Sequence, residues 1–176
     1  LCKVSVKQIK GKQGVCRILF LMDKLVVKRI EAYQAEIPGL YHEMEGSLVT
    51  FRTVLVRAGC RFGGKMVEGW GEGAPGDPAH TGQTLGIASE DIEQRIAPLI
   101  LEKEIGTASD ITEFMEEARG LRYGMGCAVT AVDAALFCAF ARAFEAPIYK
   151  LIREQLWLPP LELKDSLKIN LCGKTI

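Results

Sequence analysis

Residues 50–75 read TFRTVLVRAGCRFGGKMVEGWGEGAP, two strand-like runs joined by a glycine-rich turn. The first run, Phe51–Cys60, is rich in β-branched residues and largely apolar on both faces, which predicts a strand covered on both sides. Gly59–Lys65 predicts the turn because adjacent glycines permit a tight reversal of the chain. The second run, Met66–Ala74, predicts a strand that ends at the turn Pro75–Pro78. The stretch therefore predicts an antiparallel hairpin.

Another strand is expected ahead of this hairpin. Leu25–Ile37 is rich in β-branched residues and partly alternates between apolar and polar positions. Pro38-Gly39 ends the strand, because proline cannot donate to a ladder and glycine permits a bend. Leu40–Ser47 follows as a polar loop. These segments predict a three-stranded antiparallel meander.

After the meander the apolar residues recur with helical spacing, at Ile92, Ile96, Leu99 and Ile100. Thr84 or Ser89 is the expected N-cap of this helix, and Pro98 is expected to kink or end it. A second helix is expected to begin at Asp110, which forms a capping box with Glu113, and to end at Gly120.

Two more helices and a strand complete the pattern. Gly126–Phe144 is apolar almost all round and predicts the central buried helix. Pro147 suits the first turn of a helix that runs to Gln155, and Pro159-Pro160 reads as a stiff linker. Leu167–Cys172 alternates again and predicts a strand that has no partner within this chain. The fold class is therefore α+β, a three-stranded antiparallel meander followed by a bundle of about four helices.

Composition limits the function classes. The chain has 176 residues, with 22 basic and 22 acidic side chains and no formal net charge. This balance gives no overall electrostatic case for binding nucleic acid or membrane. No apolar run is expected to reach the roughly 18–20 residues that span a bilayer. Residues 1–21 carry basic side chains and no acidic one. We treat them as a leader segment and assign no fold or function to them.

The six cysteines do not have zinc-type spacing, because no C-x-x-C pair is present and both histidines lie far from them in sequence. We interpret them as reduced thiols of a cytoplasmic protein. Asp133 stands alone in the apolar helix, so it should be hydrogen-bonded or paired, with Arg122 or Arg142 as candidate partners. Trp70 and Glu72 share a strand face. One interpretation is that Glu72 is an acid whose pKa is raised beside the aromatic ring. The interpretation we favour is that both residues pack at a domain interface.

Several motifs, taken in order, resemble a known family. They are Phe51–Arg57 with Gly69–Pro75, then Thr81-Gly82-Gln83-Thr84, then Ala128–Phe137, and finally Pro147–Leu151. Together they resemble the N-terminal capping domain of the enolase superfamily, of the muconate-lactonizing enzyme and mandelate racemase type. The likeness is greatest to the dipeptide epimerase branch. The chain departs from the pattern at Phe137-Cys138, where family members commonly have Trp-Asp. Tyr123-Gly124 and Ile152-Arg153-Glu154 are similar to segments of methylaspartate ammonia-lyase, another member of the superfamily.

The resemblance implies a division of labour between two domains. Residues 22–160 would form the capping domain, and 161–176 a linker with the truncated first strand of a barrel domain. In this family the barrel provides a Lys-x-Lys pair and three acidic ligands for Mg²⁺, which stabilises an enediolate. The resemblance therefore implies no catalytic residue and no metal ligand in this chain, and Mg²⁺ only in the full-length parent.

The resemblance also implies candidate substrate-binding residues in two loops over the barrel mouth. The first loop contributes Tyr41 and His42, for which a solvated loop pair is the alternative. The second contributes Asp77, His80 and Thr81, for which simple turn chemistry is the alternative.

The implied activity is racemisation or epimerisation by abstraction of an α-proton next to a carboxylate, with this fragment alone inactive. The alternatives are a muconate cycloisomerase, a methylaspartate ammonia-lyase-like enzyme, or a freestanding module that binds a small ligand or a protein. The expected partners are the barrel domain, a small carboxylate substrate and further copies of the full-length protein, and neither nucleic acid nor membrane.

Overall fold

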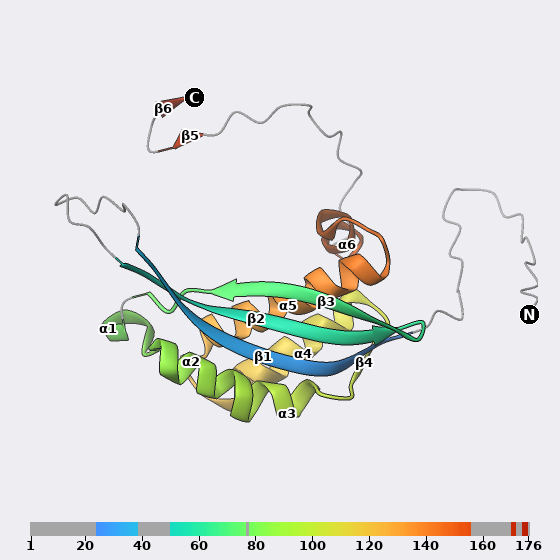
Figure 1. Cartoon of the computed structure of the whole chain (residues 1–176), viewed down its shortest axis with the longest axis horizontal. Coiled ribbons are helices and arrows are strands. Elements are labelled where there is room, and N and C mark those ends of the chain that lie inside the picture. The colour runs from blue at the N-terminus through green and yellow to red at the C-terminus, as the bar shows by residue number, and fades with distance from the viewer. Residues whose placement is uncertain (1–23, 39–49, 77, 156–169, 172–173, 176) are drawn as a thin grey trace, which may run out of the picture.

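The computed structural model describes residues 24–38, 50–76, 78–155, 170–171 and 174–175. These residues form an α+β fold in which helices cover one face of an antiparallel sheet (Figure 1). In chain order the elements are β1 (Leu25–Pro38), β2 (Thr50–Phe62), β3 (Lys65–Gly73), α1 (Pro78–Thr81), α2 (Leu85–Asp91), the π-helical turn η1 (Ile92–Ile96), α3 (Ala97–Ile100), β4 (Glu104–Ile105), α4 (Ala108–Leu121), α5 (Gly126–Ala143), α6 (Ile148–Gln155), β5 (Asn170–Leu171) and β6 (Lys174–Thr175).

The predicted meander is confirmed. β1 pairs antiparallel with β2, and β2 pairs antiparallel with β3, so the strand order is β3-β2-β1-β4. The turn between β2 and β3 holds Gly63 and Gly64 at φ of 55° and 78°, left-handed values that glycine adopts without strain. The bounds of the three strands differ from the expected bounds by at most two residues.

A short fourth strand, β4, also joins the sheet. Ile105 of β4 pairs with Leu25 at the start of β1, and both side chains are fully buried. A two-residue strand is shorter than the run of roughly four to eight residues from which alternation can be detected. The sequence pattern therefore did not indicate it.

A β-bulge between Val27 and Arg29 explains why β1 alternates only in part. A bulge inserts one extra residue, so the side chains beyond it exchange faces. Val27 is buried before the bulge, and Ile30 and Ala32 pack against the core after it. Arg29 lies on the opposite face, where its guanidinium pairs with Glu68 at 2.9 Å.

That opposite face is open over the described residues, so the expectation that β2 is covered on both sides is wrong there. Tyr33 and Trp70 lie on this face with ring centroids 5.9 Å apart. Arg57 lies 5.8 Å from the Trp70 ring centroid and pairs with Glu31 at 2.6 Å. Tyr33 is 42% exposed and Trp70 is 44% exposed. The two rings and the ion pair between Arg57 and Glu31 contact one another on this face, and no described helix or strand covers them.

Helix α5 lies directly against β3 because alternating glycines remove the side chains between them. A Cβ atom built on Gly69, Gly71 or Gly73 would lie 2.0–2.3 Å from a backbone carbonyl oxygen of α5. No substituent fits at that distance, so only glycine allows this approach. The segment Gly-Trp-Gly-Glu-Gly of β3 is therefore the surface on which α5 packs.

The first predicted helix is a continuous run of three pieces, α2, η1 and α3. Thr84 is its N-cap, as expected, and accepts a hydrogen bond from the Ile87 N–H at 3.2 Å. The π-helical turn lies directly ahead of Pro98, where the Ala97 N–H bonds to the Ile92 carbonyl five residues back. A wider turn relieves the clash between a proline ring and the carbonyl four residues earlier. Pro98 therefore modifies the helix, which ends shortly after it at Ile100.

The start of α4 needs a correction. The capping box is formed by Thr107 and Asp110, one turn earlier than the expected pair of Asp110 and Glu113. The Asp110 carboxylate accepts the N–H groups of Thr107 at 2.9 Å and Gly106 at 2.7 Å. Asp110 thus occupies the third helical position and not the cap. The helix ends at Leu121, one residue beyond the expected end.

Helix α5 is the central helix, as expected, and it requires a second correction. By length and composition alone it is apolar enough to cross a membrane, although the sequence had suggested that no segment was. Half of it is buried inside the protein, and it contacts β3, β2, α4 and α6. The core helix of a soluble protein meets the same criterion, so the finding is weak evidence for a membrane span.

The C-terminal elements confirm one expectation and correct another. α6 begins directly after Pro147, whose carbonyl accepts the Lys150 N–H at 2.9 Å. Of the predicted strand Leu167–Cys172, the structure describes only Asn170-Leu171, which pairs with Lys174-Thr175. The expectation that this strand lacks a partner within the chain is therefore wrong, because two intervening residues suffice for a hairpin. Residues 1–21 and Pro159-Pro160 lie outside the described residues.

The contact between β3 and α5 yields a stability prediction. We expect Gly71→Ala to lower the free energy of unfolding by about 3 kcal/mol, because the methyl group forces backbone against backbone. Gly120→Ala is the matched control, since nothing lies within 4 Å of a Cβ built there and alanine favours helix by about 1 kcal/mol over glycine. Urea unfolding of both variants is the measurement. Equal stabilities for Gly71→Ala and the parent would contradict the close packing.

Candidate functional site

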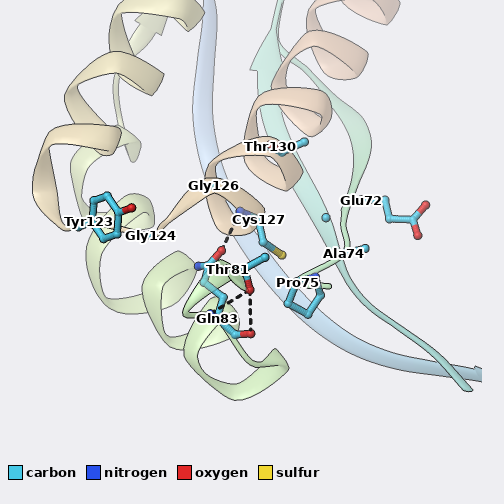
Figure 2. Close-up of a pocket in the computed structure, with 11 residues that line it drawn as sticks. Glu72, Ala74, Pro75, Thr81, Gln83, Tyr123, Gly124, Gly126, Cys127 and Thr130 are labelled. Carbon is cyan, nitrogen blue, oxygen red and sulfur yellow. Dashed lines mark hydrogen bonds between the residues drawn. The ribbon is translucent and has the colours of Figure 1, made fainter. Parts of the chain in front are cut away.

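A pocket of about 510 Å³ lies at one end of the sheet (Figure 2). Four segments line it: the end of β3 with the residues after it, the loop ahead of α2, the link between α4 and α5, and the first turns of α5. The side chains that line it include hydroxyls from Thr81 and Thr130, the amide of Gln83, and the thiol of Cys127. Such a mixture of apolar wall and a few polar groups is typical of a small-molecule site.

Glycines and a hydroxyl fix the loop that leaves β3. Gly76 and Gly82 have φ of 65° and 69°, so each permits a reversal that other residues rarely adopt. Between them α1 makes a single turn, and the Gly82 N–H bonds to the Pro78 carbonyl at 2.9 Å. The Thr81 hydroxyl accepts the Gln83 N–H at 3.2 Å. The loop thereby returns to the start of α2 beside the pocket.

A buried group of polar side chains lies behind the pocket wall. We name it the Asp91 cluster, and it consists of Gln83, Asp91, Arg95 and Arg122. The Asp91 side chain is fully buried and accepts from Arg95 at 2.8 Å. Arg122 grips the same carboxylate with two nitrogens, Nε at 3.2 Å from Oδ1 and Nη2 on Oδ2. A bidentate pair of this kind is strong and directional, and the hydrogen bond with Asp91 raises the pKa of the Arg122 guanidinium.

The Asp91 cluster reaches the pocket through two hydrogen bonds to the backbone. The Gln83 side-chain oxygen accepts the Cys127 N–H at 2.8 Å, which satisfies one orphan donor in the first turn of α5. The Arg122 Nη1 group donates to the Tyr123 carbonyl at 3.1 Å. Tyr123 is 98% exposed and lies at the pocket rim (Figure 2). One buried carboxylate therefore holds three of the segments that form the wall.

The Cys127 thiol belongs to the pocket wall, and Figure 2 shows its sulfur directed toward the side of Pro75. Burial raises the pKa of this thiol from 9.0 to about 11. The cause is desolvation, which disfavours the charged thiolate. The thiol is therefore protonated at neutral pH and acts as a small apolar wall residue.

The described residues do not fit a metal ion, because no three His, Cys, Asp or Glu side chains among them lie close enough to hold one. Glu72 is the acid that lines the pocket, and its carboxylate points away from the other lining residues in Figure 2. A single carboxylate does not hold Mg²⁺ in a closed protein site. Among the described residues the pocket wall therefore offers hydroxyl, amide and thiol groups and no cluster of metal ligands.

Residues 40–153 match the family model of the mandelate racemase / muconate lactonizing enzyme N-terminal domain. The match covers more than half of the chain. The chain belongs to this family. It is an enolase-superfamily N-terminal domain, as its motifs predicted, and the α+β fold agrees with this assignment. A search of curated proteins finds no match to the chain.

Solved structures with the same fold include enzymes of more than one reaction. The 2-chloromuconate cycloisomerase from Rhodococcus opacus 1CP is 25% identical with a TM-score of 0.60, over 72% of this chain and 34% of that one. The muconate lactonizing enzyme from Pseudomonas fluorescens, complexed with muconolactone, is 22% identical with a TM-score of 0.61, over 72% of this chain and 33% of that one. The dipeptide epimerase from Enterococcus faecalis V583, complexed with Mg and the dipeptide L-Leu-L-Tyr, is 21% identical with a TM-score of 0.59, over 72% of this chain and 34% of that one.

These numbers define what the capping domain shares with them. The chain spans about a third of the length of each of the three. At or below a quarter of identical residues, the likeness establishes the fold and leaves the reaction open. The activity of the whole protein is therefore a proposal.

The predicted site residues of the capping domain fall into three groups. Tyr41, His42 and Asp77 lie outside the described residues. The backbone of His80 lies in α1, but its side chain is not among the described ones. Thr81 is exposed and lines the pocket. The prediction that these residues contact substrate stays a prediction.

Sequence reasoning missed most of the pocket wall. Gln83 stood inside the quoted motif Thr81–Thr84 but was given no role, and Tyr123 was noted only for a resemblance. Asp91 and Arg95 are four residues apart on a helix, a spacing typical of an ordinary surface pair. Burial of Asp91 arises from the fold alone, so no local signal could have identified it.

The expected partners of Asp133 also need correction. Arg122 pairs with Asp91, and Arg142 donates to the Glu68 carbonyl at 2.9 Å. Burial raises the pKa of Asp133, and the charge of Arg119 on the neighbouring helix opposes that shift. Asp133 is only half-buried on α5, so a direct ion pair is not required.

The raised pKa of Cys127 yields a prediction about its reactivity. We expect alkylation by iodoacetamide to accelerate only as the pH approaches about 11, because the thiolate is the reacting species. Peptide mass spectrometry measures the rate at Cys127, and the chain unfolded in urea is the control. Cys60, whose pKa burial raises to about 12, should react still later. A midpoint near or below 9 at Cys127 would contradict its burial.

The same shift affects stability at high pH. The unfolded thiol releases its proton near pH 9, while the folded thiol keeps it to about 11. Stability contributed by Cys127 is therefore complete below pH 9 and is lost between pH 9 and 11. We expect the decline in unfolding free energy over that interval to be shallower in Cys127→Ala, measured by urea unfolding at each pH. Identical slopes would contradict the assignment.

Proposed function

We propose that this chain is the specificity-determining cap of a Mg²⁺-dependent enolase-superfamily enzyme that removes the α-proton of a small carboxylate substrate. The observation that carries the proposal is the family match over residues 40–153, together with a pocket at the loop end of the sheet. The proposed reaction is racemisation or epimerisation of the dipeptide epimerase kind. Its support is the order of the motifs Gly69–Pro75 and Thr81–Thr84 in the sequence.

The placement of the two loops supports the role of a cap. Pro38, where β1 ends, pairs with Thr50 at the start of β2, so residues 39–49 leave the sheet at this end. Gly73, where β3 ends, pairs with Val54 on the same part of β2. Both candidate loops are therefore attached at the same end of the sheet, and residues of the second one line the pocket. Loops on a rigid scaffold commonly provide substrate contacts and exclude water when they close.

The chemistry of proton abstraction supports a second, catalytic domain. A base acting on a weakly acidic α-proton needs a depressed lysine pKa, and the enediolate needs a strong electrostatic partner. We propose that a following barrel domain provides both, with Mg²⁺ bound there. The dipeptide epimerase with the similar fold was solved with Mg and a dipeptide. The chain's own residues would bind and orient the substrate.

Other assignments follow from the same pattern. A muconate cycloisomerase or a methylaspartate ammonia-lyase-like enzyme is the main alternative reaction, and cycloisomerases share the fold. A freestanding module that binds a small ligand is favoured by one observation, namely that the pocket is formed within this chain alone. We further propose a cytoplasmic location and a homo-oligomeric full-length protein.

The test uses the gene and its full-length product. We expect an in-frame barrel with a Lys-x-Lys pair downstream of Ile176, and α-proton exchange on L-dipeptides in D₂O that requires Mg²⁺. The 176-residue chain alone should show no exchange. Exchange by this chain alone, or a stop codon after Ile176 with a stable monomeric product that binds carboxylates, would overturn the enzyme assignment in favour of the alternatives.

The loop residues give a sharper prediction in the full-length protein. We expect His42→Ala and Thr81→Val each to raise the KM for a dipeptide about tenfold, the effect of losing one polar contact worth roughly 1.4 kcal/mol. Glu117→Gln on the exposed surface of α4 is the control. Steady-state kinetics is the measurement. Unchanged KM values across a set of dipeptides would remove these two residues from the site.

A further inference from the structure

We infer that Gln83 is a positioning residue that joins the pocket loop to the first turn of α5 by using its amide as donor and acceptor at once. This inference deepens the proposed function and rests on it for the meaning of the pocket. The hydrogen bonds of Gln83 that carry this inference lie within this chain. It assigns the shape of the pocket wall to one side chain that does not need to touch substrate.

The Gln83 side chain lies between a hydrogen-bond acceptor, the Asp91 carboxylate, and a hydrogen-bond donor, the Cys127 N–H. Its Nε2 group donates to the Asp91 carboxylate at 3.3 Å, and its Oε1 atom accepts the Cys127 N–H at 2.8 Å. Its backbone N–H is held by the Thr81 hydroxyl at 3.2 Å. The residue therefore links the loop, α2 and α5 through three hydrogen bonds.

Burial makes both functions of the amide necessary. Gln83 is 1% exposed and Asp91 is 0% exposed, so water does not replace a missing partner. An amide is uncharged and carries its donor and its acceptor on two separate atoms, so one Gln83 side chain can serve Asp91 and Cys127 at the same time. A methionine has nearly the same length but leaves the Cys127 N–H and one Asp91 oxygen without that partner.

The charges around the amide explain why its neutrality matters. Asp91 from α2, Arg95 from η1 and Arg122 after α4 meet behind it, and both guanidinium groups already bond to Asp91. Glu90 lies 3.8 Å from Arg95 on the outer side. Toward the pocket the neighbouring group is the protonated Cys127 thiol, while the exposed Glu72 carboxylate points away from the other lining residues.

A glutamate at position 83 would place its second carboxylate oxygen against Asp91 at hydrogen-bond distance. Two carboxylates in such contact share a proton, since like charges disfavour the second ionisation. Protonated, the glutamate would donate to Asp91 and accept from Cys127 as the amide does. Ionised, it would repel Asp91 and release the loop. The substitution thus converts a pH-insensitive anchor into a titrating one.

The experiment is amide hydrogen exchange on the 176-residue chain, read by NMR. In Gln83→Met we expect the Cys127 N–H to exchange about tenfold faster, the effect of losing one ordinary hydrogen bond. The amides of Thr81 and Gly82 should accelerate too, while that of Ala135 deep in α5 changes much less. Gln94→Met, at an exposed position of η1, is the matched control and should leave all of these rates at parent values.

A second variant keeps the test decisive if Gln83→Met does not fold. In Gln83→Glu, we expect parent-like protection of Cys127 at pH 4–5 and its loss toward pH 8, after correction for intrinsic exchange, while the parent ratio stays flat. Equal acceleration along the whole of α5, or a Gln83→Glu protein that matches the parent at every pH, would overturn the inference. Because no catalysis is measured, failure of the proposed function would leave this result standing, and the reverse also holds.

Discussion

Helix α5 lies so close to β3 that no side chain fits between them, and the rest of the domain is arranged around that contact. Glycines at alternate positions of β3 create the space, with hypothetical Cβ atoms 2.0–2.3 Å from the helix backbone. Because these residues alternate, one strand face is flat against the helix while Trp70 and Glu72 occupy the other. The glycines of β3 thereby fix the orientation of α5 and its distance from the sheet.

This contact also determines where the pocket forms. Gly73 ends β3 beside the first turn of α5, so the chain leaving the sheet must pass the N-terminus of that helix. The Asp91 cluster then ties this passing segment to α5 and to the residues after α4. Apolar packing places the helices against the sheet. The buried Asp91 carboxylate, with Arg95 and Arg122, then holds the segments that line the pocket. Together they produce the pocket wall at the end of β3.

The sequence predicted the frame well and the site poorly, for physical reasons. Strand alternation and helical spacing are local signals, so the meander, α5 and α6 could be placed from the residues alone. The bulge at Val27, the two-residue β4 and the capping box at Thr107 each involve too few residues for a repeating pattern to reveal them. Asp91 and Gln83 become important only because distant segments bury them, and neither has a local pattern that indicates burial.

The same physics explains the separation of roles that we propose. The described residues form a pocket and the strand ends from which the loops leave, which are the parts that we propose select a substrate. The most direct measurement of the central claim is the NOE between the Hα protons of Gly71 and the amide proton of Ala135 in the isotopically labelled chain. The account predicts a strong cross-peak, because a Cβ on Gly71 would lie 2.5 Å from that nitrogen. Absence of the cross-peak in a folded protein would show that α5 does not rest on the glycines of β3.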